Sequence, residues 1–246
     1  MNPLVSIFIP VFNGEKYLPT TLDSLLSQTF TDFEIVIVDD GSTDNTRSLA
    51  EEYCRQDSRI HLIAHKQNMG LSAARNTGWK STNPTTEFLM NHDSDDISLP
   101  TKLEQLVKYL QNHKNIDAVG TYGVYFNDQG AILGKPPIEY EPERIAKTFH
   151  KVNSMIISAT LIRRSLMDKV SPFREEYGGC DDYDFWARSL LGGFILANLP
   201  EELHHIRLHP NSFSALKRKE MEITARKIRR DYLIGKLKNK LKKILS

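Results

Sequence analysis

The 246-residue sequence has the composition of a soluble globular protein, with 40% hydrophobic and 26% charged residues. This length suits one sizeable α/β domain, alone or with an appendage. The formal net charge of +1 argues against a dedicated nucleic-acid-binding protein. The charges are unevenly placed, because residues 214–246 hold 12 Lys/Arg against 3 Asp/Glu (net +9), whereas residues 1–213 hold 20 against 28 (net −8). We therefore expect an acidic body with a basic C-terminal segment and no nucleic-acid partner.

The two cysteines, Cys54 and Cys180, lie far apart and form neither a disulfide framework nor a metal-ligand spacing. Such sparse cysteine usage is typical of a reducing compartment. The first residues, MNPLVSIFIPVF, lack the basic start and the small-residue cleavage site of a signal peptide. No apolar run approaches the ~20 residues that a membrane-spanning helix needs. The expected location is cytoplasmic, either free or peripheral at the inner face of the plasma membrane.

The first half of the chain alternates apolar strands with helices. Four β-rich apolar runs are predicted as buried strands: Val5–Val11, Glu34–Val38, Ile60–Ala64 and Phe88–Met90. Helices are predicted between them, from about Glu15, from Ser42-Thr43-Asp44 through about Arg55, and over Leu71–Lys80. This β-α-β order with short connections predicts a mostly parallel sheet with helices on both faces.

The second half has a less regular pattern. Helices are predicted at Thr101–His113, Glu141–His150, Ile162–Val170 and Asp181–Leu191. A hairpin is predicted from Ala118–Phe126 and Ala131–Leu133, and late strands at Phe194–Asn198 and Leu203–Leu208. Glu220–Leu245 has a long helical pattern with an expected interruption at Gly235. The predicted organisation is one domain of residues 1–213 and a basic amphipathic helical extension of residues 214–246.

Three carboxylates, Asp93, Asp95 and Asp96, follow the predicted strand Phe88–Met90. Like charges this close repel, and a divalent cation bound by carboxylates and substrate phosphates would relieve the repulsion. The alternative is an acidic turn that caps the next helix. Ligands of parallel sheets bind outside the carboxyl ends of the strands, so this cluster should share one rim with Pro10–Asn13 and Asp39-Asp40. That convergence favours the metal-site interpretation.

The Asp39-Asp40 pair does not indicate a dinucleotide-binding or a receiver domain. An acid at the end of a second strand holds ribose hydroxyls in dinucleotide-binding folds. Such folds need a glycine-rich turn after strand one, and the turn Phe12–Lys16 contains one glycine where three are required. In a phosphoacceptor receiver domain the acidic pair follows the first strand, which is not the arrangement here.

Three further residues complete a candidate site, each with a structural alternative. One carboxylate of the run Asp181-Asp182-Tyr183-Asp184, which opens a predicted helix, is either a general base or a helix-capping group. Arg75 follows Gly70 and either pairs with a phosphate or lies on the surface. His209 ends a late strand and is either a third metal ligand or a structural histidine. With no P-loop, Gly-x-Ser-x-Gly elbow or zinc signature in the sequence, this set favours departure of a nucleoside diphosphate held by a metal.

Four motifs in this order resemble the family 2 glycosyltransferases with a GT-A fold. They are VSIFIPVFNGEKYLPTTLDSLLSQTFTDFEIVIVDDGSTDNT, GLSAARNTGW, HDSDDISLP and DDYDFWARSL. The similarity covers residues 4 to about 212, and the four motifs together are highly specific. It implies an α/β, Rossmann-like GT-A sheet flanked by helices and an inverting, metal-dependent glycosyltransferase.

The resemblance assigns the donor-binding side of the site. Pro10 and Phe12 are expected to line the nucleotide pocket, and Asp40 to hydrogen-bond the donor base, often uracil. Arg75 is expected to approach the donor's phosphate or ribose. Phe12 stands where tyrosine is common, which removes a hydroxyl that could touch the donor.

The resemblance also assigns the metal and the base. Asp93-Ser94-Asp95 matches the DXD motif, with Asp95 as the Mn²⁺ or Mg²⁺ ligand and Asp93 shared between ribose and metal. His209 matches a late histidine that reaches the metal or the diphosphate in some members. Asp182 matches the catalytic base, while Asp96 is expected to brace the turn.

Two further departures from the family pattern lie beside these motifs. Asn91-His92 replaces a usual apolar pair before the DXD motif, so the strand end is more polar. Asp181 stands where glutamate is usual, a conservative change that leaves the base in place.

The implied activity is transfer of a hexosyl or N-acetylhexosaminyl group from a nucleotide-sugar donor, a UDP-sugar foremost, to a glycan or lipid-linked acceptor hydroxyl. The expected context is surface polysaccharide biosynthesis. A non-catalytic nucleotide-sugar-binding or scaffolding subunit is the alternative from another class. A sugar-phosphate nucleotidyltransferase is disfavoured because its glycine-rich strand-one turn is missing.

The C-terminal segment has a stripe of apolar residues at helical spacing among its basic residues: Ile228, Tyr232, Leu237, Leu241 and Ile244. Such a helix packs on its own domain or a partner chain, or lies on an anionic membrane surface. The sequence leaves these alternatives open.

Overall fold

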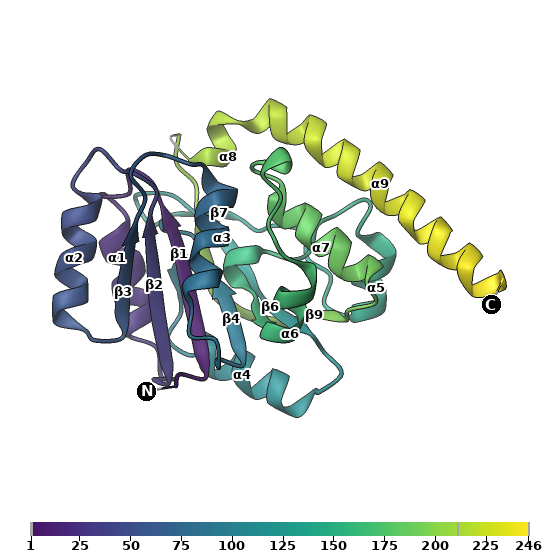
Figure 1. Ribbon diagram of the computed structural model, residues 1–246, viewed down its shortest axis with the longest axis horizontal. Coiled ribbons are helices and arrows are strands. Elements are labelled where there is room, and N and C mark those ends of the chain that lie inside the picture. The colour runs from purple at the N-terminus through teal and green to yellow at the C-terminus, as the bar shows by residue number, and fades with distance from the viewer. Residues whose placement is uncertain (1, 211, 246) are drawn as a thin grey trace.

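The computed structural model describes residues 2–210 and 212–245, which form an α/β fold around one nine-stranded sheet (Figure 1). The first half contains β1 (Val5–Val11), α1 (Leu18–Leu26), β2 (Phe33–Asp39), α2 (Thr46–Gln56), β3 (Ile60–Ala64), α3 (Leu71–Ser81), β4 (Phe88–Asn91), β5 (Ile97–Ser98) and α4 (Lys102–Asn112). The second half contains β6 (Ala118–Phe126), β7 (Ile132–Gly134), α5 (Pro142–Thr148), η1 (Ile157–Ala159), β8 (Leu161–Arg163), α6 (Arg164–Val170), η2 (Glu175–Tyr177), α7 (Asp181–Leu191), β9 (Leu196–Arg207), α8 (Phe213–Leu216) and α9 (Arg218–Leu245).

The strand order is β3-β2-β1-β4-β8-β6-β9-β5, with β7 paired to β6. β1 is parallel to both β2 and β4, and β2 is parallel to β3. β8 is antiparallel to β4 and β6, so it joins this parallel half to the long parallel pair of β6 and β9. Most paired residues are therefore in parallel register, which confirms the predicted fold class.

Helices cover both faces of the sheet because successive residues of a buried strand point to opposite sides. Ile7 and Ile9 of β1 pack in the core under α1, α2 and α4. Phe8 lies in the other core, which includes Ala74 of α3 and Trp186 of α7. Because connections between parallel strands pass through these helices, the carboxyl ends of β1, β2 and β4 meet at one edge of the sheet.

The structure differs from the predicted elements at two places in the second half. The predicted helix Ile162–Val170 starts as a strand, since Ile162 pairs with β4 and β6 before α6 begins at Arg164. The two predicted late strands are one strand, β9, whose register against β6 shifts around Pro200 and Glu201. Proline lacks a backbone N–H, so a bulge accommodates it without breaking the strand.

The predicted interruption of the C-terminal helix at Gly235 is wrong, because α9 is continuous through that residue. Gly235 instead allows close approach to α7, since a Cβ at this position would lie 2.7 Å from Leu191 Cδ1. Ile228 and Tyr232 belong to the hydrophobic core, and Tyr232 Oη donates to Ala146 O at 3.1 Å. The first half of α9 is thus part of the fold.

The last turns of α9 extend beyond the rest of the molecule (Figure 1). Leu237 and Leu241 are 63% and 57% exposed there. Among residues 2–210 and 212–245, no helix combines the length and the apolar character that crossing a bilayer requires.

Candidate active site

The rim at the carboxyl ends of β1, β2 and β4 gathers side chains from both halves of the chain. The turn Asp93–Asp96 follows β4 directly. β5 comes immediately after this turn and pairs with β9 at His204 and His205. That pairing brings the segment after β9, including His209, back to the turn.

Asp95 and His209 are in contact, as the metal-site hypothesis requires. His209 Nε2 lies 3.0 Å from Asp95 Oδ2, although the two residues are 114 positions apart. Burial, together with the negative charges of Asp96 and Asp93, raises the pKa of Asp95 to about 7. A carboxylate that is this unfavourable as an isolated anion is suited to hold a cation.

Asp96 has the bracing role that the sequence predicts for it. Its Oδ1 accepts from Arg207 N at 3.0 Å, and its Oδ2 accepts from Ser158 Oγ at 2.8 Å. His204 Nε2 lies 2.9 Å from the same Oδ2. All these partners belong to other segments, so Asp96 ties the turn to β9 and η1.

Arg75 is buried and joins the DXD segment to the helix that carries Asp182. Its Nη1 donates to Asp181 Oδ1 at 2.7 Å and its Nη2 to Asp93 Oδ1 at 3.4 Å. Burial alone would lower the pKa of Arg75, but the carboxylates of Asp181, Asp93 and Asp182 outweigh burial and raise it. Arg75 is therefore a fixed positive charge between the two halves of the site, and its contact with a donor stays a prediction.

Asp182 lies in the first turn of α7 and is partly exposed, whereas the adjacent Asp181 is fully buried. Asp182 Oδ1 accepts from Tyr183 N at 2.7 Å, and no hydrogen bond within the described residues reaches its other oxygen. Burial raises the pKa of Asp182 to about 6, with the charge of Asp181 adding to the effect and that of Arg75 opposing it. Such a carboxylate can accept a proton near neutral pH.

The carboxylate of Asp40 is hydrogen-bonded by other residues of the protein. Its carboxylate accepts from Met69 N at 2.9 Å and from Gly70 N at 2.8 Å, and its Oδ1 lies 2.7 Å from His65 Nδ1. The side chain is nearly fully buried, so in this structure it shapes the loop that leads into α3. The predicted contact of Asp40 with the donor base is not tested by this arrangement.

Pro10 and Phe12 differ in their access to the rim. Pro10 is buried within β1, opposite Val38 of β2. Phe12, just beyond the strand, is 46% exposed and presents an aromatic ring at the rim. Of the two predicted pocket residues, Phe12 can offer a stacking surface.

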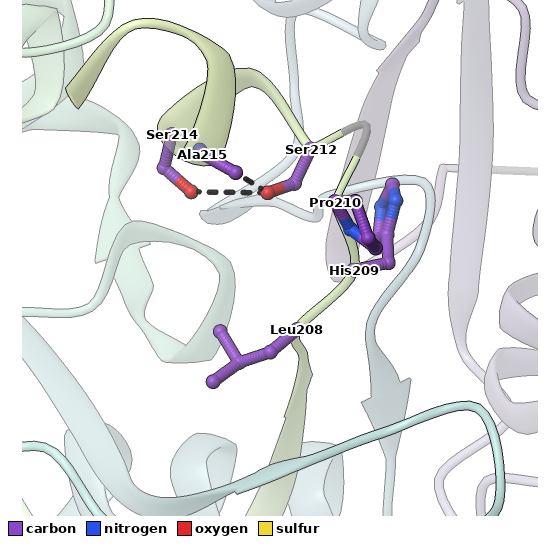
Figure 2. Close-up of a pocket in the computed structure, with 6 residues that line it drawn as sticks. All are labelled: Leu208, His209, Pro210, Ser212, Ser214 and Ala215. Atoms are coloured by element: carbon purple, nitrogen blue, oxygen red, sulfur yellow. Dashed lines mark hydrogen bonds between the residues drawn. The ribbon is translucent and has the colours of Figure 1, made fainter.

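Six residues around the end of β9 and the start of α8 line a surface pocket of about 380 Å³ (Figure 2). Leu208, His209 and Pro210 lie on one arm of this loop, and Ser212, Ser214 and Ala215 on the other. Ser212 Oγ accepts from Ala215 N at 3.3 Å, which caps α8 and fixes the second arm. The pocket thus opens next to the Asp95–His209 pair.

Two residues around His209 were not predicted from the sequence. The Tyr17 ring packs 4.6 Å from the His209 ring, centroid to centroid. Arg207 donates to Asp95 O at 2.9 Å, and its guanidinium lies 4.7 Å from the Tyr17 ring centroid. No spacing or motif links Tyr17 to the end of β9, so only the folded arrangement reveals this support.

A second group missed by the sequence is buried beneath the turn. Lys102, His204 and His92 are all fully buried and connected through hydrogen bonds. Burial lowers the pKa of Lys102 to about 7, against the opposing charges of Asp96 and Asp93. Burial also lowers the pKa values of His92 and His204 well below their usual range, so both imidazoles are neutral at physiological pH.

The chemistry of Asp93, Asp95 and His209 fits a divalent cation, because carboxylate and imidazole ligands suit Mn²⁺ and Mg²⁺. Among residues 2–210 and 212–245, however, no three His, Cys, Asp or Glu side chains are gathered into a preformed metal site. Mg²⁺ commonly binds one or two carboxylates and completes its shell with substrate phosphates and water. The residues therefore fit a cation that binds together with a diphosphate.

Comparisons with known proteins identify the family of the chain. A family model described as glycosyl transferase family 2 matches residues 6–171. An uncharacterized glycosyltransferase of Haemophilus influenzae is 33% identical over 252 residues, covering 96% of this chain and 76% of that protein.

Two solved structures have similar folds. S. aureus TarS 1–349 in complex with UDP has a TM-score of 0.68 and 26% identity, over 87% of this chain and 63% of the TarS chain. The mannosyltransferase PcManGT from Pyrobaculum calidifontis, solved with GDP-Man and Mn²⁺, has a TM-score of 0.70 and 18% identity, over 92% of this chain and 63% of that chain. This chain thus spans less than two thirds of both solved chains.

The sheet order and the carboxylate-lined rim define a glycosyltransferase with the GT-A fold. With the family model matching most of the chain, the protein belongs to glycosyl transferase family 2.

Proposed function

We propose that this protein transfers a hexosyl or N-acetylhexosaminyl group from a nucleotide sugar, a UDP-sugar foremost, to an acceptor hydroxyl with inversion. The observation that carries this proposal is the linkage from Asp182 through its buried neighbour Asp181 and Arg75 to Asp93 of the DXD turn. A base and a diphosphate-binding turn held in fixed relation are what a single in-line displacement needs. The complex of TarS with UDP supports the choice of donor.

Asp182 is proposed as the general base. It accepts the proton of the acceptor hydroxyl as that oxygen attacks the anomeric carbon, on the face opposite the departing diphosphate. Its partly exposed position and raised pKa suit proton transfer near neutral pH. The pocket lined by His209, Ser212 and their neighbours would offer a place for part of the acceptor.

Asp95, His209 and Asp93 are proposed to hold a divalent cation, Mn²⁺ or Mg²⁺, together with the donor diphosphate. When bound, that cation would neutralise negative charge on the leaving group. Asp93 remains oriented by Arg75 on the side that faces Asp181. Phe12 would stack against the donor base, and Asp40 would contact the base through its carboxylate or through the loop that it holds.

A panel of nucleotide sugars, each assayed with Mn²⁺ or with EDTA, tests this function by release of the nucleoside diphosphate. We expect release that depends on one donor, on an acceptor and on the metal. Metal-independent release would contradict the role of Asp95. Tight UDP binding without turnover on any donor and acceptor would instead indicate a non-catalytic nucleotide-sugar-binding subunit.

We further propose that the end of α9 lies on an anionic membrane surface, which would bring the enzyme to a lipid-linked acceptor of surface polysaccharide assembly. Leu237 and Leu241 are exposed near the end of α9, between lysines that would face the lipid headgroups, while Asn239 on another face of the helix donates to Leu191 O at 2.9 Å. Each basic residue near such a surface contributes about 1 kcal/mol.

The membrane proposal is best tested by point substitution, because removal of residues 214–246 would also remove Ile228 and Tyr232 from the core. Leu237→Asp/Leu241→Asp is expected to lose sedimentation with anionic liposomes and to keep its melting temperature. Unchanged sedimentation of this variant would show that α9 does not anchor the protein.

A further inference from the structure

Lys102, the first residue of α4, lies fully buried beneath the turn Asp93–Asp96. In its protonated form Lys102 is an ammonium group, which has three N–H donors and no acceptor, and the hydrogen-bond directions below are those of this form. Nζ has three partners, Ser158 O at 2.8 Å, His204 Nδ1 at 3.0 Å and Ser98 Oγ at 3.2 Å. The three donors are therefore matched by three acceptors, and the directions of the neighbouring hydrogen bonds follow from this one group.

The first branch runs through His204 to the end of the turn. Because Lys102 only donates, His204 Nδ1 must accept, and the single proton of the neutral imidazole lies on Nε2. That Nε2–H lies 2.9 Å from Asp96 Oδ2 and 3.1 Å from Ser158 Oγ, and the Ser158 hydroxyl itself donates to Asp96 Oδ2, so both contacts of the Nε2–H lead to Asp96. Lys102 thus makes His204 a donor to Asp96.

The second branch runs through Ser98 and His92 to the start of the turn. A backbone carbonyl only accepts, so His92 Nδ1 carries the proton that it donates to Asp93 O at 2.8 Å. The bare Nε2 then accepts from the Ser98 hydroxyl at 2.8 Å. Ser98 Oγ is left to accept from Lys102, so the directions deduced from the two ends of this branch agree.

We propose that Lys102 is the positioning residue of the diphosphate- and metal-binding turn. From one buried ammonium group it directs hydrogen bonds to both ends of the turn, to Asp93 O and to Asp96 Oδ2, and so holds the carboxylates of Asp93 and Asp95 between them. It touches neither ligand side chain and acts only through His204, Ser98 and His92. This inference rests on the proposed metal-dependent function. The second branch requires both ring nitrogens of His92, one bonded to Asp93 O and the other to Ser98 Oγ.

The hydrogen-bond directions are testable without metal or substrate. Histidine ¹⁵N–¹³C NMR of the wild-type protein is expected to show the Nε2–H tautomer for His204 and the Nδ1–H tautomer for His92. The opposite tautomer at either histidine in the wild-type protein would overturn the relay. Methionine has a similar length to lysine but no hydrogen-bond donor. In Lys102→Met we therefore expect His204 to populate both neutral tautomers.

Affinity for Mn²⁺ distinguishes a residue that positions the metal-binding turn from one that only stabilises the fold. Lys102→Met leaves three buried acceptors without their donor and removes the positive charge near Asp96, so it is expected to have a lower melting temperature, and affinities are compared well below that temperature. With UDP present, we expect it to bind Mn²⁺ about tenfold or more weakly, the usual effect of losing support behind a metal ligand, as measured by the EPR signal of free Mn²⁺. Ser98→Ala removes only the second branch and should cause a smaller loss. This variant also keeps the proposal testable if Lys102→Met does not fold.

Lys108→Met on the exposed face of α4 is the matched control and should bind Mn²⁺ as the wild type does. Equal Mn²⁺ affinity of the wild type and Lys102→Met would overturn the positioning role alone. Wild-type protein that binds UDP but no Mn²⁺ would overturn the proposed metal function itself.

Discussion

At the scale of single residues, the proposed chemistry depends most on Asp182. A general base must be ionised, and because burial raises the pKa of Asp182 to about 6, its carboxylate form predominates only above that pH. We therefore expect kcat/KM to be level at neutral pH and to fall about tenfold per pH unit below about pH 6.

Asp182→Asn should lower turnover by about 10²–10⁴-fold with little change in UDP affinity, because the amide cannot take the proton.

The measurement is nucleoside diphosphate release from pH 5 to 8 at saturating Mn²⁺, with UDP affinity from calorimetry. Asp168→Asn, at an exposed position of α6, is the control and should leave rate and pH profile unchanged. Wild-type turnover by Asp182→Asn would exclude it as the base.

The sequence predicted the residues of the rim better than their partners. Asp95 and His209 were predicted as ligands of one cation, a role that stays a prediction, and their side chains lie in contact. The bracing of the turn by Asp96 was expected, and its hydrogen bonds to β9 and η1 are present. The pairing of Arg75 with Asp181 was not, because a buried arginine and a surface arginine look alike in the sequence. Lys102 likewise has the sequence context of an ordinary helix-start lysine, and only its packing against β9 and η1 buries it. Which residues pair across more than a hundred positions of the sequence depends on the fold, and no short sequence pattern indicates it.

At the scale of elements, α3 is held against β1 by a glycine. A Cβ on Gly78 would lie 2.9 Å from Phe8 Cβ and 3.0 Å from its Cδ2, and Phe8 is fully buried. We expect Gly78→Ala to destabilise the protein by about 1–2 kcal/mol, since overpacking costs about 1–3 kcal/mol and the gain in helix propensity offsets up to about 1 kcal/mol. Urea unfolding measures this change, and activity should fall with it because α3 carries Arg75.

Gly235→Ala in α9 is the matched control. Its Cβ would meet only the methyl ends of Leu191, a partly exposed side chain that can rotate away. We expect this substitution to be neutral or to stabilise by up to about 1 kcal/mol. An equal loss of stability in both variants would mean that close helix packing at Gly78 is not the cause.

The predictability of the elements follows their length and their partners. β1 and β2 have continuous apolar runs, because burial on both faces leaves a strong pattern, and they were predicted with β4 and the edge strand β3, which is mostly only partly buried. β5 and β8 have two and three residues, too few for any period, and they exist because β9, β4 and β6 offer them partners. The continuity of α9 through Gly235 also depends on tertiary packing, against Leu191 of α7.

At the scale of the whole molecule, the site lies where the two halves of the chain meet. The first half supplies Asp93 and Asp95, and the second supplies Asp182 and His209. Several contacts cross between them at the rim, among them Arg75 with Asp181 and His209 with Asp95. A ligand bound at Asp95 and His209 therefore stabilises the association of the halves as well as its own site.

This arrangement predicts a thermal shift that requires metal and nucleotide together. A ligand at 100 times its Kd stabilises the folded state by about 2.7 kcal/mol, which corresponds to roughly 5–10 °C in Tm for a chain of this size. We expect UDP with Mn²⁺ to raise the Tm by about that amount, and UDP with EDTA to raise it much less. Asp95→Asn and His209→Ala should each remove most of the Mn²⁺-dependent part, because each takes a ligand from the side of the rim where the halves meet. Asp168→Asn should keep the full shift. A full shift in EDTA, or in both ligand variants, would mean that the nucleotide is held without the cation and that the contact between Asp95 and His209 serves the fold alone.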